Sequence, residues 1–314
     1  MTTNLWFSAR FIRPWAIRPL TWHSVRLSST AQTSIKHPLP DGPAQQQRFR
    51  EFNLDGKVFV VTGGGRGLGL SMAEALVEAG GEVHCLDLLP TPHADFHATQ
   101  ARASPDFGGG LHYTSLDVRD RPATETALAS IAARRNRLDG VIVAAGINHI
   151  ADALDYTDHD IARIIDTNYT GVFYTATAAG RQMLAHRTRG SILLVASMSG
   201  LIANKGMYSS IYNSSKAAVV QLGCSLAMEW AKVDGDGSGG VRVNALCPGH
   251  VVTPMAHMVI DRDPATKRLW ETENMMGRLG RPEEFRGLAL LMMSEASSFM
   301  TGATLVCDGG HTAW

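Results

Sequence analysis

The sequence predicts one α/β domain built on a doubly wound sheet of seven parallel strands, with helices on both faces. From Lys57 onward, short runs rich in β-branched residues alternate with longer helical patterns, which is typical of right-handed βαβ units. A glycine-rich segment follows the first of these runs and leads directly into the first helical pattern. Together these observations indicate a nucleotide-binding α/β domain, because such a strand, turn and helix form an anion site.

The predicted strands are short apolar runs that can be buried on both faces of a sheet. They lie at residues 58–61, 82–86, 111–115, 140–144, 191–195, 241–246 and 303–307. A first helix is expected at 71–79. Thr157 and Asp160 form a capping pair, which predicts the start of a long helix that runs past Asn168 toward His186. The stretch 234–240 contains four glycines and predicts an exposed connection.

The composition excludes several classes of protein. The chain has 314 residues, of which 45% are hydrophobic, and its 29 basic residues equal its 29 acidic ones, so it offers no basic field for nucleic acid. No apolar run approaches the roughly 18 residues that suggest membrane insertion. The four cysteines are scattered and lack the spacing of a zinc site or a disulfide framework; they are Cys85, Cys224, Cys247 and Cys307. We therefore expect four buried free thiols and no metal.

The N-terminal region differs in composition from the rest. Residues 1–40 contain no acidic residue but carry four arginines and a lysine among aromatic and aliphatic side chains. The arginines interrupt every apolar stretch before it is long enough for a secretory signal. This pattern predicts a mitochondrial presequence for import into the matrix, the alternative being a basic disordered tail on a cytoplasmic protein. Residues 41–53 are predicted to be a linker and residues 54–314 the folded α/β domain.

The glycine-rich segment at residues 62–69 predicts a dinucleotide site, because backbone N–H groups and a helix N-terminus converge there on a pyrophosphate. Asp87 ends the second strand, where a carboxylate bonds the ribose diol and repels a 2′-phosphate. We therefore expect NAD(H). Arg66 lies inside the turn, where a guanidinium is able to meet a 2′-phosphate, so NADP(H) stays open.

Over residues 54–314 the chain resembles the classical short-chain dehydrogenase/reductase family. The motifs are Thr62-Gly63-x-x-x-Gly67-x-Gly69, Asp117-Val118, Ala145-Gly146, Asn168, Ser197, Tyr212-x-x-x-Lys216, Pro248-Gly249-x-Val251-x-Thr253 and Asp308-Gly309-Gly310. One departure is Val143-Ala144, where the family usually has two asparagines. The resemblance implies a Rossmann-type fold and a homodimer or homotetramer. It also implies a cofactor bound by Gly63, Arg66, Gly67, Leu68, Gly69, Asp87, Asp117, Val118, Ala145, Gly146, Asn168, Tyr212, Lys216, Val251 and Thr253.

The predicted catalytic residues are Asn168, Ser197, Tyr212 and Lys216. Lys216 lies four residues after Tyr212 on one helix face, so we expect its ammonium to lower the pKa of the phenol that moves the proton. Ser197 ends a strand, where its hydroxyl stabilises charge on the substrate oxygen. By resemblance, Asn168 holds a water that links Lys216 to solvent. Ser199 is an alternative catalytic serine. We prefer Ser197, because aligning Gly200 with the family's glycine after the fifth strand puts Ser197 at the serine position.

The predicted activity is hydride transfer between a nicotinamide cofactor and a secondary alcohol or ketone. Residues 196–200, 212–216 and 308–314 resemble sugar-alcohol dehydrogenases and ketose reductases, so we expect a polyol/ketose pair such as D-arabinitol and ribulose. A reductase of other ketones or of 3-oxoacyl groups is the alternative. A dinucleotide-binding module without turnover is a different class, and an extended-branch epimerase or dehydratase is a third.

Two further groups of side chains are predicted to lie in the substrate cleft or beside it. His149, His250 and His257 follow predicted strand ends, where ligands bind in open α/β sheets. The four methionines Met255, Met258, Met275 and Met276 predict either a mobile lid over the cleft or ordinary helix packing.

Overall fold

The computed structural model describes residues 49–103, 109–261 and 263–314. The predicted presequence at 1–40 and most of the predicted linker at 41–53 lie outside the described residues. The first described element is a short 3-10 helix, Arg50–Phe52.

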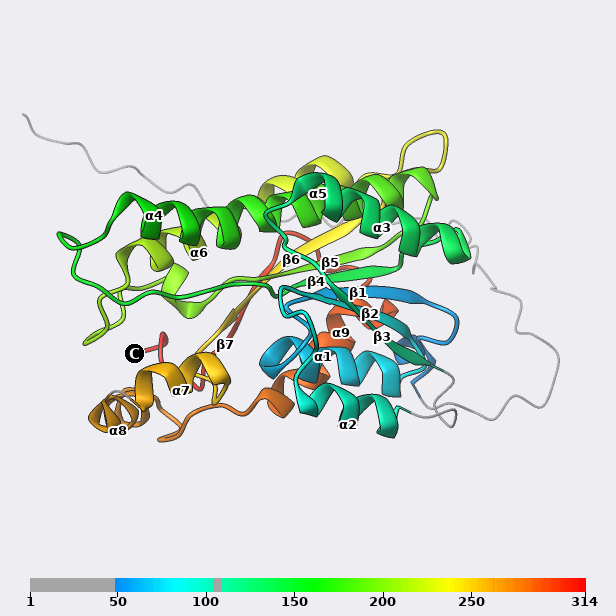
Figure 1. Ribbon diagram of the computed structural model, residues 1–314. Helices are drawn as coiled ribbons and strands as arrows, with labels where there is room; N and C mark the ends of the chain where they lie inside the picture. The colour runs from blue at the N-terminus through cyan, green and yellow to red at the C-terminus, as the bar shows by residue number, and fades with distance from the viewer. Residues whose placement is uncertain (1–48, 104–108, 262) are drawn as a thin grey trace, which may run out of the picture. The chain divides into compact units, whose positions relative to one another are not determined.

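The core is one sheet of seven parallel strands in the order β3-β2-β1-β4-β5-β6-β7 (Figure 1). The strands are β1 (Val58–Thr62), β2 (Glu82–Asp87), β3 (Gly110–Ser115), β4 (Gly140–Val143), β5 (Ser191–Val195), β6 (Arg242–Pro248) and β7 (Thr304–Cys307). All seven predicted strands are confirmed, with ends that differ by no more than two residues. The chain changes direction across the sheet between β1 and β4, which is where open α/β sheets bind ligands.

Helices cover both faces of the sheet, as predicted. One face carries α1 (Gly67–Glu78), α2 (Ala94–Arg102) and α9 (Arg286–Met293), and the other carries α3 (Arg121–Arg135), α5 (Gly171–Ala185) and α6 (Ser210–Trp230) (Figure 1). Alternate residues of β1 serve the two cores, since Val60 packs in the cluster that contains Ala176 of α5, whereas Val61 packs in the cluster that contains Met72 of α1. Burial on both faces explains why the strands are continuous apolar runs.

The long helix predicted from Thr157 is present, but its middle is wider than an α-helix. The Thr157 hydroxyl accepts a hydrogen bond from the Asp160 N–H at 3.1 Å and starts α4 (Asp158–Ile165). A π-turn, Asp166–Thr170, then joins α4 to α5. Such turns are common at functional sites, and this one contains Asn168.

Other features bear on the remaining predictions. Residues 234–240 form a largely exposed connection, as expected. All four cysteines are free, but Cys224 is exposed and Cys307 only partly buried, so the prediction of four buried thiols is wrong.

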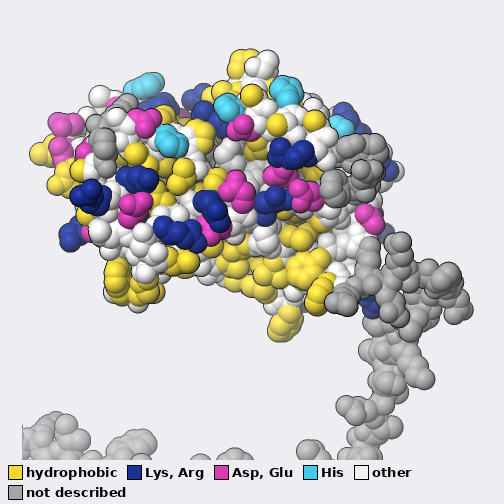
Figure 2. Space-filling view, turned by 90° about the horizontal axis from the view of Figure 1, so that it is seen from below, with side chains coloured by type: hydrophobic (Ala, Val, Ile, Leu, Met, Phe, Trp, Pro, Cys, Tyr) yellow, Lys and Arg dark blue, Asp and Glu magenta, His cyan; other side chains and the backbone are white. Residues whose placement is uncertain are grey.

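Within the described ranges, no helix combines the length and hydropathy that crossing a membrane requires. Figure 2 shows basic and acidic side chains interspersed on one face of the protein.

Candidate active site

A cavity of about 580 Å³ lies along the carboxyl ends of the central strands. Its volume is in the range of small-molecule sites. It is lined by the predicted residues Gly63, Arg66, Gly67, Leu68, Gly69, Asp87, Asp117, Val118, Ala145, Gly146, Ser197, Tyr212, Lys216, Val251 and Thr253, and also by Ser199. Folding thus brings together segments from Gly63 to Thr253 that lie far apart along the chain.

The glycine-rich turn lines this cavity and closely approaches the residues that follow β4. Gly63 has a φ of +68°, and a Cβ on it would lie 2.8 Å from the Ala145 N. A Cβ on Gly69 would collide with the carbonyl oxygen of Gly63. Because neither position tolerates a side chain, the backbone and the start of α1 stay open toward the cavity. This cradle fits the pyrophosphate of a dinucleotide.

Asp87 lies on the cavity wall at the end of β2. Its carboxylate accepts hydrogen bonds from the Gly65 N–H at 3.0 Å and from the Leu89 N–H at 3.3 Å. These contacts tie the second strand to the glycine-rich turn. Arg66 is exposed and also lines the cavity, so both residues expected to select the cofactor face it.

Asp117 is paired with a residue that sequence reasoning missed. The Arg119 guanidinium binds the Asp117 carboxylate with N–O distances as short as 2.6 Å, and this hydrogen bonding lowers the pKa of Asp117. Both residues line the cavity. Their separation of two residues is the only signal in the sequence, and it is too common to identify a site.

Tyr212 and Lys216 lie on α6 and line the same cavity as the glycine-rich turn. Lys216 is buried; its ammonium donates a hydrogen bond to the Val195 carbonyl at 2.9 Å and lies 5.7 Å from the centre of the Tyr212 ring. Burial lowers the pKa of Lys216 to about 8.

The pKa of Tyr212 differs from the expectation. Burial raises it, and a hydrogen-bonding interaction with the Ser197 side chain only partly opposes this effect. The predicted lowering by Lys216 is therefore wrong for this structure. The physical reason is that the ammonium is directed to the end of β5 and desolvation of the phenolate dominates.

Ser197 follows β5 and faces the tyrosine. Its Oγ accepts a hydrogen bond from the Ser199 N–H at 3.1 Å, which leaves the hydroxyl proton available to another acceptor. The Ser199 hydroxyl instead accepts a hydrogen bond from the Asn204 amide at 2.5 Å. Both hydroxyls thus keep a proton to donate, and it is the hydrogen-bonding interaction of the Ser197 side chain with Tyr212 that favours Ser197 over Ser199 as the partner of a substrate oxygen.

Among the predicted catalytic and cofactor-binding residues, Asn168 alone does not line the cavity, because its side chain is fully buried in the π-turn. Its amide donates to the Ile147 carbonyl at 2.9 Å and to the Ser215 hydroxyl at 3.1 Å, and its oxygen accepts from the Ile147 N–H at 2.8 Å. Asn168 therefore holds the segment after β4 against α6, the helix that carries Tyr212.

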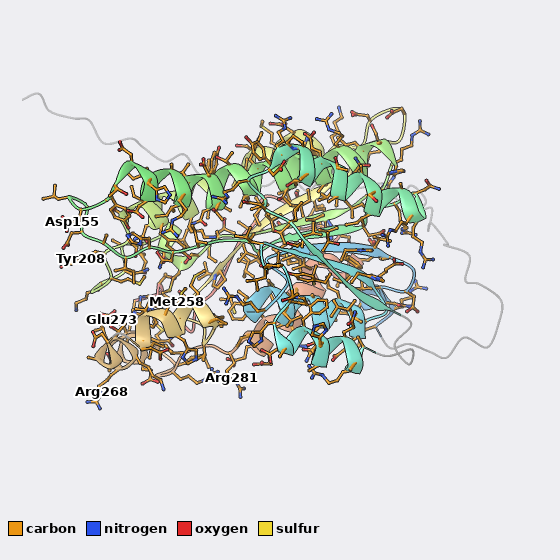
Figure 3. All side chains as sticks on the ribbon, in the orientation of Figure 1. Asp155, Tyr208, Met258, Arg268, Glu273 and Arg281 are labelled. Carbon is orange, nitrogen blue, oxygen red and sulfur yellow. The ribbon has the colours of Figure 1, made fainter. Side chains whose placement is uncertain are left out.

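The substrate end of the cavity is lined mainly by apolar side chains. These are Met198, Met207, Met255, Met258, Val259 and Trp270, several of them from α7 (Pro254–Ile260) and α8 (Pro264–Thr272). Figure 3 labels Met258 on α7. Met275 and Met276 are exposed and do not line the cavity. Asn148 adds a buried side-chain oxygen without a hydrogen-bond partner in the described part of the chain.

His250 is the only one of the three predicted cleft histidines that lines the cavity. Its ring stacks on Trp270 with centroids 4.0 Å apart and meets His311 edge-on at 5.4 Å. Burial lowers the pKa of His250 to about 3, so this imidazole is neutral. Nothing in the sequence pairs it with Trp270, because the contact depends on how α8 packs.

The amino-acid sequence is similar to those of known dehydrogenases and reductases. Residues 63–312 match the family model described as enoyl-(acyl carrier protein) reductase. Galactitol 2-dehydrogenase of Rhizobium johnstonii is 40% identical over 86% of this chain and 99% of its own. The short-chain dehydrogenase/reductase notP′ of Aspergillus versicolor is 39% identical over 84% and 89%. The ribulose-forming D-arabinitol 2-dehydrogenase of Scheffersomyces stipitis is 33% identical over 84% and 96%.

A solved structure agrees as well. The gluconate 5-dehydrogenase of Burkholderia cenocepacia, in complex with NADP and tartrate, is 30% identical and superposes with a TM-score of 0.74 over 85% of this chain and 99% of that one. Fold and site together define an oxidoreductase that binds a nicotinamide dinucleotide and acts on secondary alcohols. The chain belongs to the short-chain dehydrogenase/reductase family.

Proposed function

We propose that this enzyme interconverts a polyol and a ketose, with D-arabinitol and ribulose as a representative pair. The observation that carries the proposal is that Tyr212, Ser197 and Lys216 line the same cavity as the glycine-rich turn. Similarity to galactitol and D-arabinitol dehydrogenases supports a sugar alcohol as the substrate.

The proposed chemistry assigns a separate task to each side chain. A bound nicotinamide dinucleotide supplies or accepts the hydride. In reduction, Tyr212 donates its phenol proton to the ketone oxygen, and in oxidation it takes the proton back. Ser197 donates a hydrogen bond to the same oxygen and stabilises its developing charge. Because burial raises the pKa of Tyr212, the phenol is protonated at neutral pH and ready to act as a donor.

Lys216 and Asn168 are assigned to a proton relay that connects Tyr212 to solvent. A lysine whose pKa is about 8 is close to the working pH, which suits a group that passes protons onward to solvent. Asn168 positions the segment around Ile147 next to α6, which supports its assignment to the same relay.

We also propose that the enzyme prefers NAD(H). The Asp87 carboxylate on the cavity wall supports this preference, because it opposes a 2′-phosphate. Arg66 on the same wall supports the opposite preference. Assays with both cofactors in parallel distinguish the two, and a higher kcat/KM with NADP(H) would reverse the assignment.

A second candidate substrate is a bulky apolar ketone. The specific observation in its favour is the methionine-rich lining of the substrate end, where Met207, Met258 and Trp270 offer few partners for the hydroxyls of a sugar. A panel of polyols, ketoses, 3-oxoacyl thioesters and aryl ketones, followed by nicotinamide absorbance, separates the candidates. The highest kcat/KM on a polyol or ketose supports the first, and the highest on an apolar ketone supports the second.

We propose that residues 1–40 direct the protein to the mitochondrial matrix. The basic, acid-free composition of this region supports import. A fusion of residues 1–40 to a fluorescent protein should accumulate in mitochondria, whereas a fusion in which the arginines are replaced by glutamine should stay in the cytosol. Cytosolic fluorescence of the first fusion would contradict the proposal.

We further propose a homodimer or homotetramer. Exposed apolar side chains on the surface support self-association, among them Phe173 on α5, Met228 on α6 and the fully exposed Phe299. Light scattering on the purified enzyme gives the mass directly, and a monomer at micromolar concentration would overturn this assignment.

A further inference from the structure

Three potential metal ligands lie together on the outer strands of the sheet. Glu82 and His84 are alternate residues of β2, so their side chains point to the same face. His112 on β3 is paired in register with His84, which places it on that face as well. β3 is the edge strand of the sheet. The cluster sits near the starts of these strands, whereas the catalytic cavity follows their carboxyl ends.

The distances within this cluster suit a metal ion. The imidazole rings of His84 and His112 are stacked with centroids 4.6 Å apart. Glu82 Oε1 lies 3.4 Å from Nε2 of His84 and 3.8 Å from Nε2 of His112, and one ligand atom from each residue lies within 4.8 Å of the others. Zinc–ligand bonds of about 2.0–2.2 Å put neighbouring ligands of a tetrahedral site about 3.3–3.6 Å apart.

His84 has a buried ring nitrogen, Nε2, that makes no hydrogen bond within the described residues. Its side chain is 4% exposed, and its Nε2 has no hydrogen-bond partner within the described part of the chain. Buried polar atoms without a partner are rare and call for an explanation.

The surroundings orient the carboxylate and leave an entry. Arg135 at the end of α3 binds Oε2 of Glu82 at 3.0 Å, which turns Oε1 toward the two histidines. Outer partners of this kind commonly fix ligand orientation in metal sites. The His112 side chain is 46% exposed, so an ion is able to enter from solvent and a water is able to take the fourth position.

We propose that Glu82, His84 and His112 form a binding site for a divalent transition metal, with two imidazoles and one carboxylate as the ligands that zinc accepts. A bound ion joins the edge strand β3 to β2 and stabilises this side of the sheet. This proposal departs from the expectation of no metal. That expectation rested on spacing along the chain, and His112 follows His84 by 28 residues in a different strand, so only the strand pairing brings the two together.

The test uses the full-length protein without a histidine tag, freed of metal by chelation. Isothermal titration with Zn²⁺ measures affinity, and the visible spectrum with Co²⁺ reports tetrahedral coordination. His112→Ala should weaken Zn²⁺ binding at least about 10-fold and abolish the Co²⁺ bands. His159→Ala, a substitution of an exposed histidine on α4, should leave both unchanged. Zn²⁺ should raise the Tm of the wild type and of the His159→Ala variant only.

A second variant guards against misfolding. Glu82→Gln keeps the shape of the side chain but removes the carboxylate, so it should also weaken Zn²⁺ binding at least about 10-fold while the circular dichroism of the metal-free protein stays native. Absence of Zn²⁺ binding in the wild type would overturn the proposal. An affinity that is equal in the wild type, His112→Ala and Glu82→Gln would overturn it too.

Discussion

The two halves of the catalytic cavity are built differently. The cofactor half has walls of backbone, where Gly63 and Gly69 allow close approach and Asp87 is held by two N–H groups. The substrate half is walled by long flexible side chains such as Met258 on α7 and Met207. A wall of backbone suits the cofactor, which all members of the family bind. The side chains of the substrate half are able to differ between members without disturbing the fold. The activity class is therefore readable from the first half, and the substrate depends on the second.

Tyr212 lies where the two halves meet, and its replacement should have the largest effect. Tyr212→Phe removes the proton donor but keeps the ring, so kcat should fall by about 10²–10⁴-fold. Cofactor affinity, measured by fluorescence titration, should change little because the cofactor half is intact. Full activity of the variant on the best substrate would contradict the assignment.

Lys216 should make the free energy of unfolding depend on pH, because its ammonium is buried. Its folded pKa of about 8 is below the value near 10.4 of an unfolded lysine, so the unfolded chain binds more protons between these pH values. The free energy of unfolding should therefore rise with pH from about 8 to 10.4, by a contribution of about 3 kcal/mol from this group.

Lys216→Met should lack this contribution. Urea unfolding of the metal-free and cofactor-free protein at several pH values gives the comparison. Parallel pH profiles for the wild type and Lys216→Met would mean that the ammonium is not desolvated.

Asn168 tests whether the π-turn supports the cofactor half. Asn168→Ala removes three hydrogen bonds, two of them to the partly buried backbone of Ile147, so the free energy of unfolding should fall by about 1–3 kcal/mol. Gln221→Ala, at an exposed amide on α6, should change it by less than about 0.5 kcal/mol. Equal effects of the two substitutions would remove Asn168 from this role.

Asp87 tests how the cofactor half selects between NAD(H) and NADP(H). Asp87→Ser removes the charge that opposes a 2′-phosphate, so the ratio of kcat/KM for NAD(H) to that for NADP(H) should fall about 10-fold, or ~1.4 kcal/mol. Asp155→Ser, at an exposed position labelled in Figure 3, is the control and should leave the ratio unchanged. An unaltered ratio in Asp87→Ser would shift attention to Arg66.

Met258 should give the smallest effect and tests the substrate half. Its side chain is about half exposed, so Met258→Ala should raise KM for an apolar ketone only about 2- to 5-fold. KM for NAD(H) should stay constant. Met228→Ala, at an exposed methionine outside the cavity, should alter neither constant. A larger change in the constant for NAD(H) would mean that the two halves are not independent.

Sequence reasoning reached most of the fold because its signals are local. Continuous apolar runs located all seven strands, and the capping pair at Thr157 located the start of α4. The hydrophobic pattern did not locate the π-turn, since one extra residue within a single turn is too local a change to stand out in a pattern averaged over several turns. The exposure of Cys224 escaped it as well, because the face that a cysteine occupies on α6 depends on the packing of that helix.

The amino-acid sequence was sufficient to place the functional groups relative to the strands and helices. It put a glycine-rich turn after the first strand, an acidic residue at the end of the second, and a tyrosine and a lysine one helical turn apart. Tertiary structure alone decided which side chains act on one another. It buried Asn168 against Ile147, stacked His250 on Trp270 and paired His84 with His112. The physical reason is that secondary structure follows from neighbours along the chain, whereas burial, pKa values and ligand geometry follow from neighbours in space.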